Sequence, residues 1–222
     1  MNSPDANDRL VAIESLLTAI PAERDDLGRI PLARITLAPG AEAPDTFLAG
    51  PIAAVVESGT VEVVLGDTVV TVPVGQLVTA VEGSSLTARN PTDTPVSLLA
   101  LPQVTRDDWG IALSEFPPPG VTFTLLIPYQ ELMQRQAPGL FSLDRITLEP
   151  GAAYTPAASA STTSSLDAIA ILVESGTVAT DDALFNDTFS AGANAVLPPG
   201  TTLQATPNGP ATMLLVRMAA EE

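Results

Sequence analysis

Short apolar runs alternate with Gly, Pro, Asp and Asn along most of the chain, at intervals of about ten residues. This pattern is typical of an all-β sandwich or barrel. In the first half it predicts strands over Leu32 to Leu37, Ile52 to Val56, Val61 to Leu65, Thr68 to Val72, Leu77 to Ala80, Ser85 to Ala88 and Val96 to Leu101. In the second half it predicts strands over Leu143 to Leu148, Ala168 to Val173, Ala195 to Leu197, Thr202 to Ala205 and Thr212 to Met218. Gly66 and Asp67 predict a tight hairpin, because glycine takes the positive φ that such a turn requires.

Periodicity alone leaves residues 10–20 open between strand and helix, since their apolar residues also fit one helical face. However, Leu16 to Pro21 resembles Thr124 to Pro128, and Val121 to Ile127 is rich in β-branched and aromatic residues. We therefore predict strands in both places. A short helix is expected after each, most clearly at Pro128 to Arg135, where proline occupies the first turn.

The chain contains an internal repeat. Arg34 to Ala41 reads RITLAPGA and returns as RITLEPGA from Arg145 to Ala152, an offset of 111 residues. The run VESGTV contains Gly59 in one copy and Gly176 in the other, an offset of 117. Each copy of a repeat is expected to be a folding unit of similar shape.

The two offsets place six additional residues in the second copy, within the Ser/Thr/Ala stretch Ala157 to Ser165, where a loop tolerates insertion. We expect one domain over residues 1–104 and a second over residues 121–222. The proline-rich segment 105–120 is the expected connector.

Charge and composition exclude several functions. The net charge of −17, from 26 acidic and 9 basic residues, would repel nucleic acid and anionic lipid. No apolar run reaches the ~20 residues of a membrane span. The polar start of the chain predicts a cytoplasmic protein, although a secreted protein already cleaved from its signal would show the same sequence. Cysteine is absent, which excludes disulfides and thiolate chemistry. A monomer and a homodimer both remain open.

The spacing of glycine and proline resembles the two motifs of the cupin superfamily. The first family motif is Gly, five residues, His-x-His, three or four residues, Glu, six residues and Gly. The second is Gly, five residues, Pro-x-Gly, two residues, His, three residues and Asn. Copy one reproduces these skeletons from Gly40 to Gly59 and from Gly75 to Asn90. Copy two follows them from Thr163 to Gly176 and from Gly192 to Leu203. The resemblance covers most of residues 30–102 and 141–218, and it implies a bicupin of two tandem jelly-roll β-barrels with short helical segments.

In the family, the three histidines and the glutamate of these motifs bind a divalent metal inside the barrel. Those positions here are Thr46, Leu48, Ile52 and Leu86 in copy one, and Thr163, Ser165, Ile169 and Leu203 in copy two. Since the chain contains no histidine, the resemblance implies the fold without its metal. No cofactor is expected, and the metal-dependent activities common among cupins are not carried over.

Other catalytic chemistry is limited because the chain lacks both His and Lys as a general base. Glu57 and Glu174, at the same point of each copy, could form a carboxylate pair for acid/base work. We favour the interpretation that each begins a turn and faces water. The residues Asp181, Asp182 and Asp187 lack the pattern of a calcium loop.

Two functional hypotheses follow. The favoured one is a metal-free bicupin that binds a small apolar or neutral molecule, or serves as a structural or sensory module. The alternative is a metal-independent isomerase or lyase that acts on a sugar or small acid through a carboxylate, Tyr129 or Tyr154. A buried Asp or Glu beside Tyr or Arg would favour the enzyme, whereas apolar walls, which we expect, would favour binding or pure structure.

The second barrel is the expected binding site, because Ser165 replaces the leucine found at Leu48. A ligand there would contact Thr163, Ser165, Ile169 and Leu203, with Tyr154 as a lid. In the first barrel, Leu48, Ile52 and Leu86 are expected to form a packed core.

Overall fold

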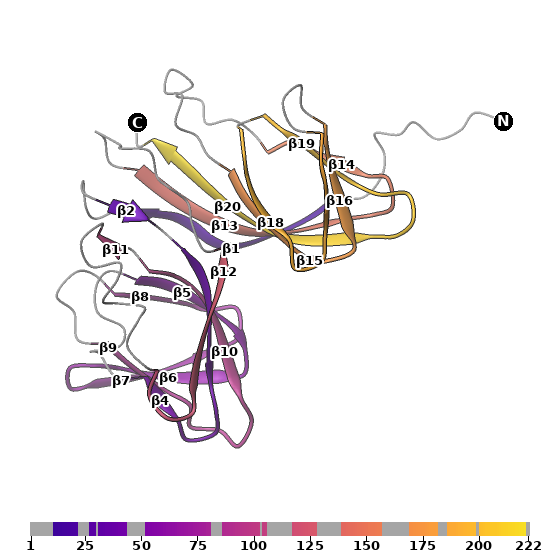
Figure 1. Ribbon diagram of the computed structural model, residues 1–222. Coiled ribbons are helices and arrows are strands. Elements are labelled where there is room, and N and C mark those ends of the chain that lie inside the picture. Colours follow the sequence, from indigo (N-terminus) through magenta and orange to yellow (C-terminus); the bar gives the residue numbers. More distant parts are fainter. Residues whose placement is uncertain are drawn as a thin grey trace. The chain divides into compact units, whose positions relative to one another are not determined.

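The computed structural model describes residues 11–21, 27–29, 31–43, 52–80, 86–102, 104–105, 117–127, 139–156, 169–181, 186–198 and 200–220. Within these residues the regular elements are β-strands (Figure 1), which confirms the all-β prediction. The helix expected at Pro128 to Arg135 lies outside the described residues. No helix in the described ranges is long and apolar enough to cross a membrane.

The chain divides into two compact units. Residues Ile20–Pro138 are termed the first barrel, and Met1–Ala19 together with Gly139–Glu222 are termed the second barrel. Each contains one copy of the sequence repeat.

The first barrel contains a five-stranded and a four-stranded sheet, and a short two-stranded one. The five-stranded sheet has the order β12 (Val121–Ile127), β3 (Leu32–Leu37), β10 (Val96–Pro102), β5 (Ile52–Ser58) and β8 (Leu77–Ala80). The four-stranded sheet has the order β4 (Glu42–Ala43), β9 (Leu86–Arg89), β6 (Thr60–Leu65) and β7 (Thr68–Pro73). The remaining pair is β11 (Val104–Thr105) with β2 (Leu27–Arg29).

The second barrel repeats the two larger sheets. Its five-stranded sheet has the order β1 (Val11–Pro21), β13 (Gly139–Leu148), β20 (Ala211–Ala220), β15 (Ile169–Ser175) and β18 (Asn194–Leu197). Its four-stranded sheet has the order β14 (Ala153–Tyr154), β19 (Thr202–Ala205), β16 (Thr177–Asp181) and β17 (Thr188–Ser190).

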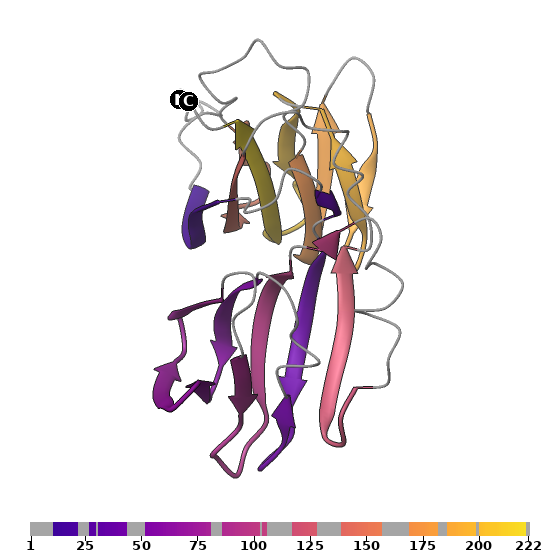
Figure 2. The same ribbon diagram turned by 90° about the vertical axis from the view of Figure 1, so that its left-hand side faces the viewer.

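The strand that precedes each copy belongs to the barrel of the other copy. β12 precedes the second copy but pairs antiparallel with β3 of the first barrel, and Figure 2 shows these two strands side by side in pink and violet. β1 precedes the first copy but lies next to β13 in the second barrel. The division therefore differs from the boundaries expected from the repeat, which assigned β1 to the first domain and β12 to the second. Sequence order does not determine which sheet edge a strand joins, because pairing is a long-range contact.

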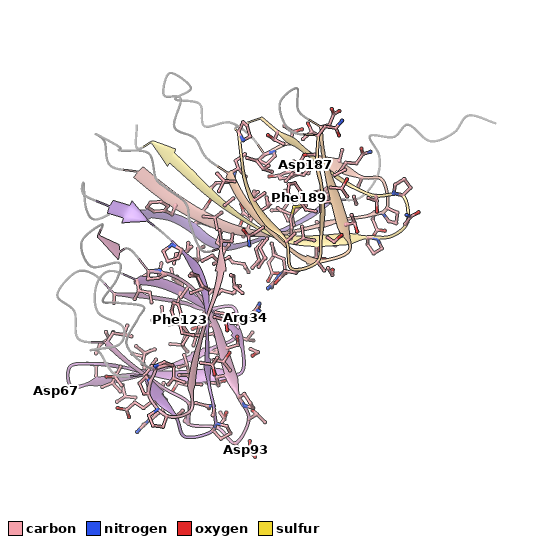
Figure 3. The ribbon with its side chains drawn as sticks, viewed as in Figure 1. Arg34, Asp67, Asp93, Phe123, Asp187 and Phe189 are labelled. Carbon is pink, nitrogen blue, oxygen red and sulfur yellow. The ribbon has the colours of Figure 1, made fainter. Side chains whose placement is uncertain are left out.

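Side chains alternate between the barrel interior and the outside, as the pleat of a strand requires. In β3, Ile35 and Leu37 belong to the core of the first barrel, and Phe123 of β12 packs against it (Figure 3). In β13, Ile146 and Leu148 are likewise in the core of the second barrel. Both cores draw on both larger sheets of their barrel, so each sheet pair encloses an apolar interior.

The hairpin predicted at Gly66 and Asp67 is confirmed. Leu65 of β6 lies opposite Thr68 of β7, which leaves a two-residue turn, and Gly66 has φ 57°. Asp67 lies at the end of this hairpin (Figure 3).

Candidate functional site

A carboxylate lies in the interior of the second barrel. Asp144 is two residues from Ile146 along β13, so its side chain shares the face of the strand that builds the core. Its exposed fraction is 1%. A buried carboxylate is costly unless it is paired and hydrogen-bonded, so its partners decide what it does.

Two side chains satisfy Asp144. Arg217 of β20 donates from Nη2 to Oδ2 over 2.5 Å, and Ser15 of β1 donates from Oγ to Oδ1 over 2.9 Å. Three strands that are distant in sequence thus meet at one carboxylate. Arg217 in turn lies opposite Ile169 in the ladder between β20 and β15, and Ile169 is one of the cupin metal positions.

Arg217 retains unused hydrogen-bonding capacity. Its Nε is buried and has no acceptor among the described residues, while the side chain as a whole is 34% exposed. Ser15 donates to one oxygen of Asp144, and the guanidinium donates to the other through Nη2. A buried donor without an acceptor costs about 1–3 kcal/mol.

Tyr154 packs against the core of the barrel that contains this ion pair. It is half-buried in β14 and lies opposite Leu203 of β19. Burial raises the pKa of the Tyr154 hydroxyl; the charge of Arg217 lowers it, and the carboxylate of Asp144 raises it. A phenol is neutral at ordinary pH even without this shift, and the raised pKa moves its ionisation to still higher pH.

The structure brings together three of the residues expected to bind a ligand. Ile169, Leu203 and Tyr154 all contribute to the core of the second barrel. Thr163 and Ser165 lie outside the described residues, as does the whole inserted stretch Ala157 to Ser165.

One residue equivalence taken from the sequence is wrong. The spacing to Gly83 and Gly200 equated Leu86 with Leu203. In the ladders, however, Leu203 lies opposite Thr180, and the matching Val63 of the first barrel lies opposite Ala88. Leu203 therefore corresponds to Ala88, and Leu86 corresponds to Thr201. The reason is that the segment between Gly200 and Leu203 is two residues shorter than the segment between Gly83 and Ala88.

In the first barrel, the positions that match Asp144, Arg217 and Tyr154 hold no polar side chain. The ladders match Asp144 with Ala33 and Arg217 with Pro102, and the repeat matches Tyr154 with Ala43. Its interior contains a cavity of about 20 Å³, which is room for about one water molecule. The cavity is lined entirely by apolar side chains: Ile35, Ala43, Ile52, Ala54, Val63, Val78, Leu86, Ala88 and Leu98.

Two of the predicted core residues, Ile52 and Leu86, line this cavity and are almost fully buried. Thr46 and Leu48 lie outside the described residues. The apolar walls expected from the sequence are therefore present in the first barrel, whereas the second barrel departs from that expectation.

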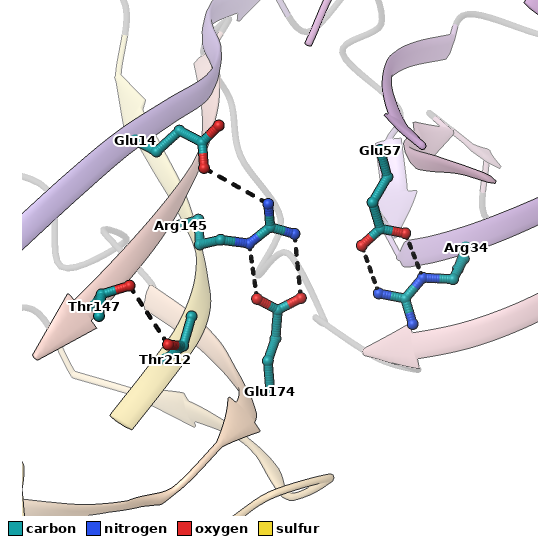
Figure 4. Close-up of polar contacts among 7 residues, drawn as sticks. All are labelled: Glu14, Arg34, Glu57, Arg145, Thr147, Glu174 and Thr212. Carbon is teal, nitrogen blue, oxygen red and sulfur yellow. Dashed lines mark hydrogen bonds and ion pairs between the residues drawn. The ribbon is translucent and has the colours of Figure 1, made fainter. Parts of the chain in front are cut away.

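The repeated glutamates pair with the repeated arginines. Arg34 donates to Glu57 through Nε and Nη2 over 2.7 and 2.8 Å, and Arg145 binds Glu174 through the same two nitrogens over 2.8 and 3.3 Å (Figure 4). The expectation that these glutamates face water is corrected, because their side chains are only 18% and 20% exposed. An arginine that donates two hydrogen bonds to one carboxylate requires both partners, which explains why the arginine and the glutamate recur together in the two copies.

No metal site emerges from the described residues, which contain no group of three or more His, Cys, Asp or Glu side chains able to hold an ion. Ile52, Leu86 and Ile169 carry no donor atoms, and Thr201, which the ladders match with Leu86, offers only a hydroxyl. The family metal therefore does not fit the cupin positions that the structure describes. Asp181 and Asp187 are both exposed.

The sequence analysis missed Asp144, Arg217 and Ser15. A signal was available, because Asp144 and Arg217 are charged residues within otherwise apolar predicted strands, and their counterparts in copy one are uncharged. Only the strand pairings reveal that the two charges face the same interior.

No protein-family model and no curated protein sequence matches the chain. Solved structures do. AerE from Microcystis aeruginosa shares 14% identity with a TM-score of 0.50, covering 94% of this chain and 100% of that chain. The protein YhaK from Escherichia coli shares 16% identity with a TM-score of 0.52, covering 93% of this chain and 92% of that chain. Bacillus subtilis oxalate decarboxylase shares 12% identity with a TM-score of 0.51, covering 99% of this chain and 80% of that chain.

These neighbours are cupin-fold proteins, and the chain has the cupin fold. The resemblance inferred from the glycine spacing is confirmed at the level of the fold.

Proposed function

We propose that this cupin-fold protein binds a small molecule in its second barrel without a metal, and that the first barrel is a structural core. The observation that carries the proposal is the asymmetry between two interiors of the same fold. Asp144, Arg217 and Tyr154 occupy places that hold only Ala and Pro in the first barrel. Because the first barrel has these sheets without such a group, the fold does not require it.

The composition of the second interior supports a binding site. Ligand pockets are mostly apolar, with a few convergent polar groups that orient the ligand. Here Ile169 and Leu203 supply apolar surface, and Arg217 supplies a buried N–H that has no acceptor in the described part of the chain. A ligand oxygen at that donor would recover the free energy that the unpaired group costs.

The state of the polar groups favours binding over catalysis. Acid/base catalysis works best when the pKa of the acting group lies near the operating pH. The pKa of Tyr154 is instead raised, and both oxygens of Asp144 already accept hydrogen bonds. These groups suit hydrogen bonding to a ligand better than the transfer of a proton.

The proposal is tested by identifying what the protein carries. Protein purified without chelator is denatured, and released molecules are identified by mass spectrometry while metals are measured by elemental analysis. We expect an organic molecule with the wild type and with the first-barrel control Ile52→Val, and none with Arg217→Leu. Retention of one equivalent of a transition metal after dialysis would contradict the metal-free part. No released molecule, together with no thermal shift in a metabolite extract, would contradict binding.

A metal-independent isomerase or lyase acting on a sugar or small acid is the second candidate. One observation favours it, namely a buried Asp144 that is paired with Arg217 in the barrel that also contains Tyr154. Such an enzyme would incorporate deuterium from ²H₂O into a C–H bond of its substrate, and Tyr154→Phe would abolish this exchange. Binding without exchange would leave the first proposal as the function.

A further inference from the structure

We propose that the second barrel selects an electrically neutral ligand, one that offers a carbonyl or hydroxyl oxygen to Arg217 and Tyr154 and an apolar body to the barrel wall. This inference rests on the proposed function and adds the chemical class of the ligand.

Arg217 gives the site a buried donor, Nε, that has no partner among the described residues. The hydroxyl of Tyr154, which packs against the same core, is a second potential donor. The Tyr154 phenol carries its proton at ordinary pH, as any phenol with a pKa near or above 10 does. A ligand that satisfies these groups must therefore present an acceptor oxygen.

The charges of the site are already balanced. The carboxylate of Asp144 lies 2.5 Å from the guanidinium of Arg217 and neutralises its charge. Only 1% of the surface of Asp144 is exposed. A ligand carboxylate at Arg217 would approach this buried anion, in a chain whose net charge is −17. A ligand cation would approach the guanidinium. A charged ligand would thus lose its hydration without meeting a net opposite charge.

The surrounding wall is apolar. Side chains that share the interior with Asp144 and Arg217 belong to a buried hydrophobic cluster that includes Ile146, Ile169, Leu203, Met213 and Leu215. Apolar walls favour an apolar ligand body, and the polar group then recognises one oxygen on it.

The experiment compares three probes of one shape that differ in charge: benzamide, benzoate and benzamidinium. The set propionamide, propionate and propionamidinium repeats the comparison at smaller size. The chain has only two tyrosines, so in full-length protein carrying ¹³C-tyrosine the Tyr129→Phe change leaves a single labelled side chain, Tyr154. Its NMR signal reports binding even at millimolar affinity.

We expect the amide of at least one set to bind at least ten-fold more tightly than its anionic and cationic analogues. Benzoate or propionate binding as tightly as its amide would overturn the inference, while leaving the proposed function in place if Arg217→Leu abolishes that binding. No response to any probe at about 50 mM would also overturn it, since Kd values above that level contribute less than ~2 kcal/mol of binding. The proposed function would still be tested separately, by identifying the molecule that the denatured protein releases.

Removal of the balancing charge provides a second readout. In Asp144→Asn the charge of Arg217 is no longer compensated, so the preference should reverse towards the carboxylate by at least ten-fold. Tyr154→Phe removes the labelled side chain, so its affinities are measured from the NMR signals of the probes instead; it should weaken amide binding several-fold without reversing the order. If Asp144→Asn does not fold, the Tyr154→Phe comparison still tests the inference, because a carboxylate preference in that variant contradicts it. An unchanged order of affinities in a folded Asp144→Asn protein contradicts it as well.

Discussion

Arg217 Nη2 lies 2.5 Å from Asp144 Oδ2 in the interior of the second barrel, although 73 residues separate them in the chain. Their counterparts in the first barrel are Pro102 and Ala33. One fold thus occurs twice in this protein, once with an apolar interior and once with a buried ion pair and a half-buried tyrosine. The second interior is where a ligand is proposed.

The ion pair should stabilise the protein only as a pair. Asp144→Ala is expected to lower the free energy of unfolding by about 3 kcal/mol, because it leaves a guanidinium partly buried without its partner. Adding Arg217→Leu should recover much of this loss, since the interior then resembles that of the first barrel. Chemical denaturation of the wild type, both single variants and the double variant measures the coupling. A double variant as unstable as the sum of the singles would show that the two charges do not interact.

Stability should fall at high pH through Tyr154. Its folded pKa is raised above the usual value near 10, mainly by burial, so the protonated phenol is favoured in the folded state. This contribution is fully present below about pH 10 and is lost as the pH rises through the folded pKa. The unfolding free energy of the wild type should therefore decline more steeply above about pH 10 than that of Tyr154→Phe. Between about pH 6 and 8 the difference between the two proteins should be constant. Parallel curves across the whole range would contradict the shift.

The glycine of the second VESGTV run should be irreplaceable. Gly176 has φ 75°, and a Cβ added there would lie 2.2 Å from the carbonyl oxygen of Pro210. Gly192 is a matched control, because it has φ 86° but open space around its Cβ position. We expect Gly192→Ala to cost about 1–2 kcal/mol from backbone strain alone, and Gly176→Ala to cost several kcal/mol more. Equal losses in thermal denaturation would show that the loop before β20 moves aside.

Restoring polar metal-ligand types to the first barrel should destabilise it. Ile52→Glu combined with Leu86→His would bury polar groups without partners, at an expected cost of several kcal/mol. The control, Ile52→Val with Leu86→Met, should cost about 1 kcal/mol per site. Thermal unfolding compares the two. A midpoint like that of the wild type in the Glu/His variant would show that the interior admits water.

The placement of β12 predicts which fragment folds. Residues 20–138 include β12, whereas residues 1–104 lack it and leave the edge of β3 unpaired. Only the longer fragment should unfold cooperatively, because Val121 and Phe123 of β12 contribute to the core. Circular dichroism and denaturation compare the fragments. Cooperative unfolding of residues 1–104 would show that β12 is dispensable.

Local pattern was sufficient for most strands and turns. The predicted strands Leu32 to Leu37 and Leu77 to Ala80 coincide with β3 and β8, and the turn at Gly66 has the predicted conformation. The two-residue strands β4, β11 and β14 and the three-residue strands β2 and β17 were missed, because so short a segment has no periodicity to detect. The five-residue strand β16 was missed as well. The glycine spacing led to the cupin fold, since turns impose their backbone requirements on single residues.

The sequence by itself determined most of the longer strands, the repeat, the absence of histidine and the type of fold. Tertiary structure alone decided that β1 belongs to the second barrel, that Leu203 matches Ala88, and that Asp144 meets Arg217. The reason is physical: alternation along a strand specifies which residues share a face, but not which strand lies beside it. That choice depends on packing between segments far apart in the chain, and the candidate site is built from such contacts.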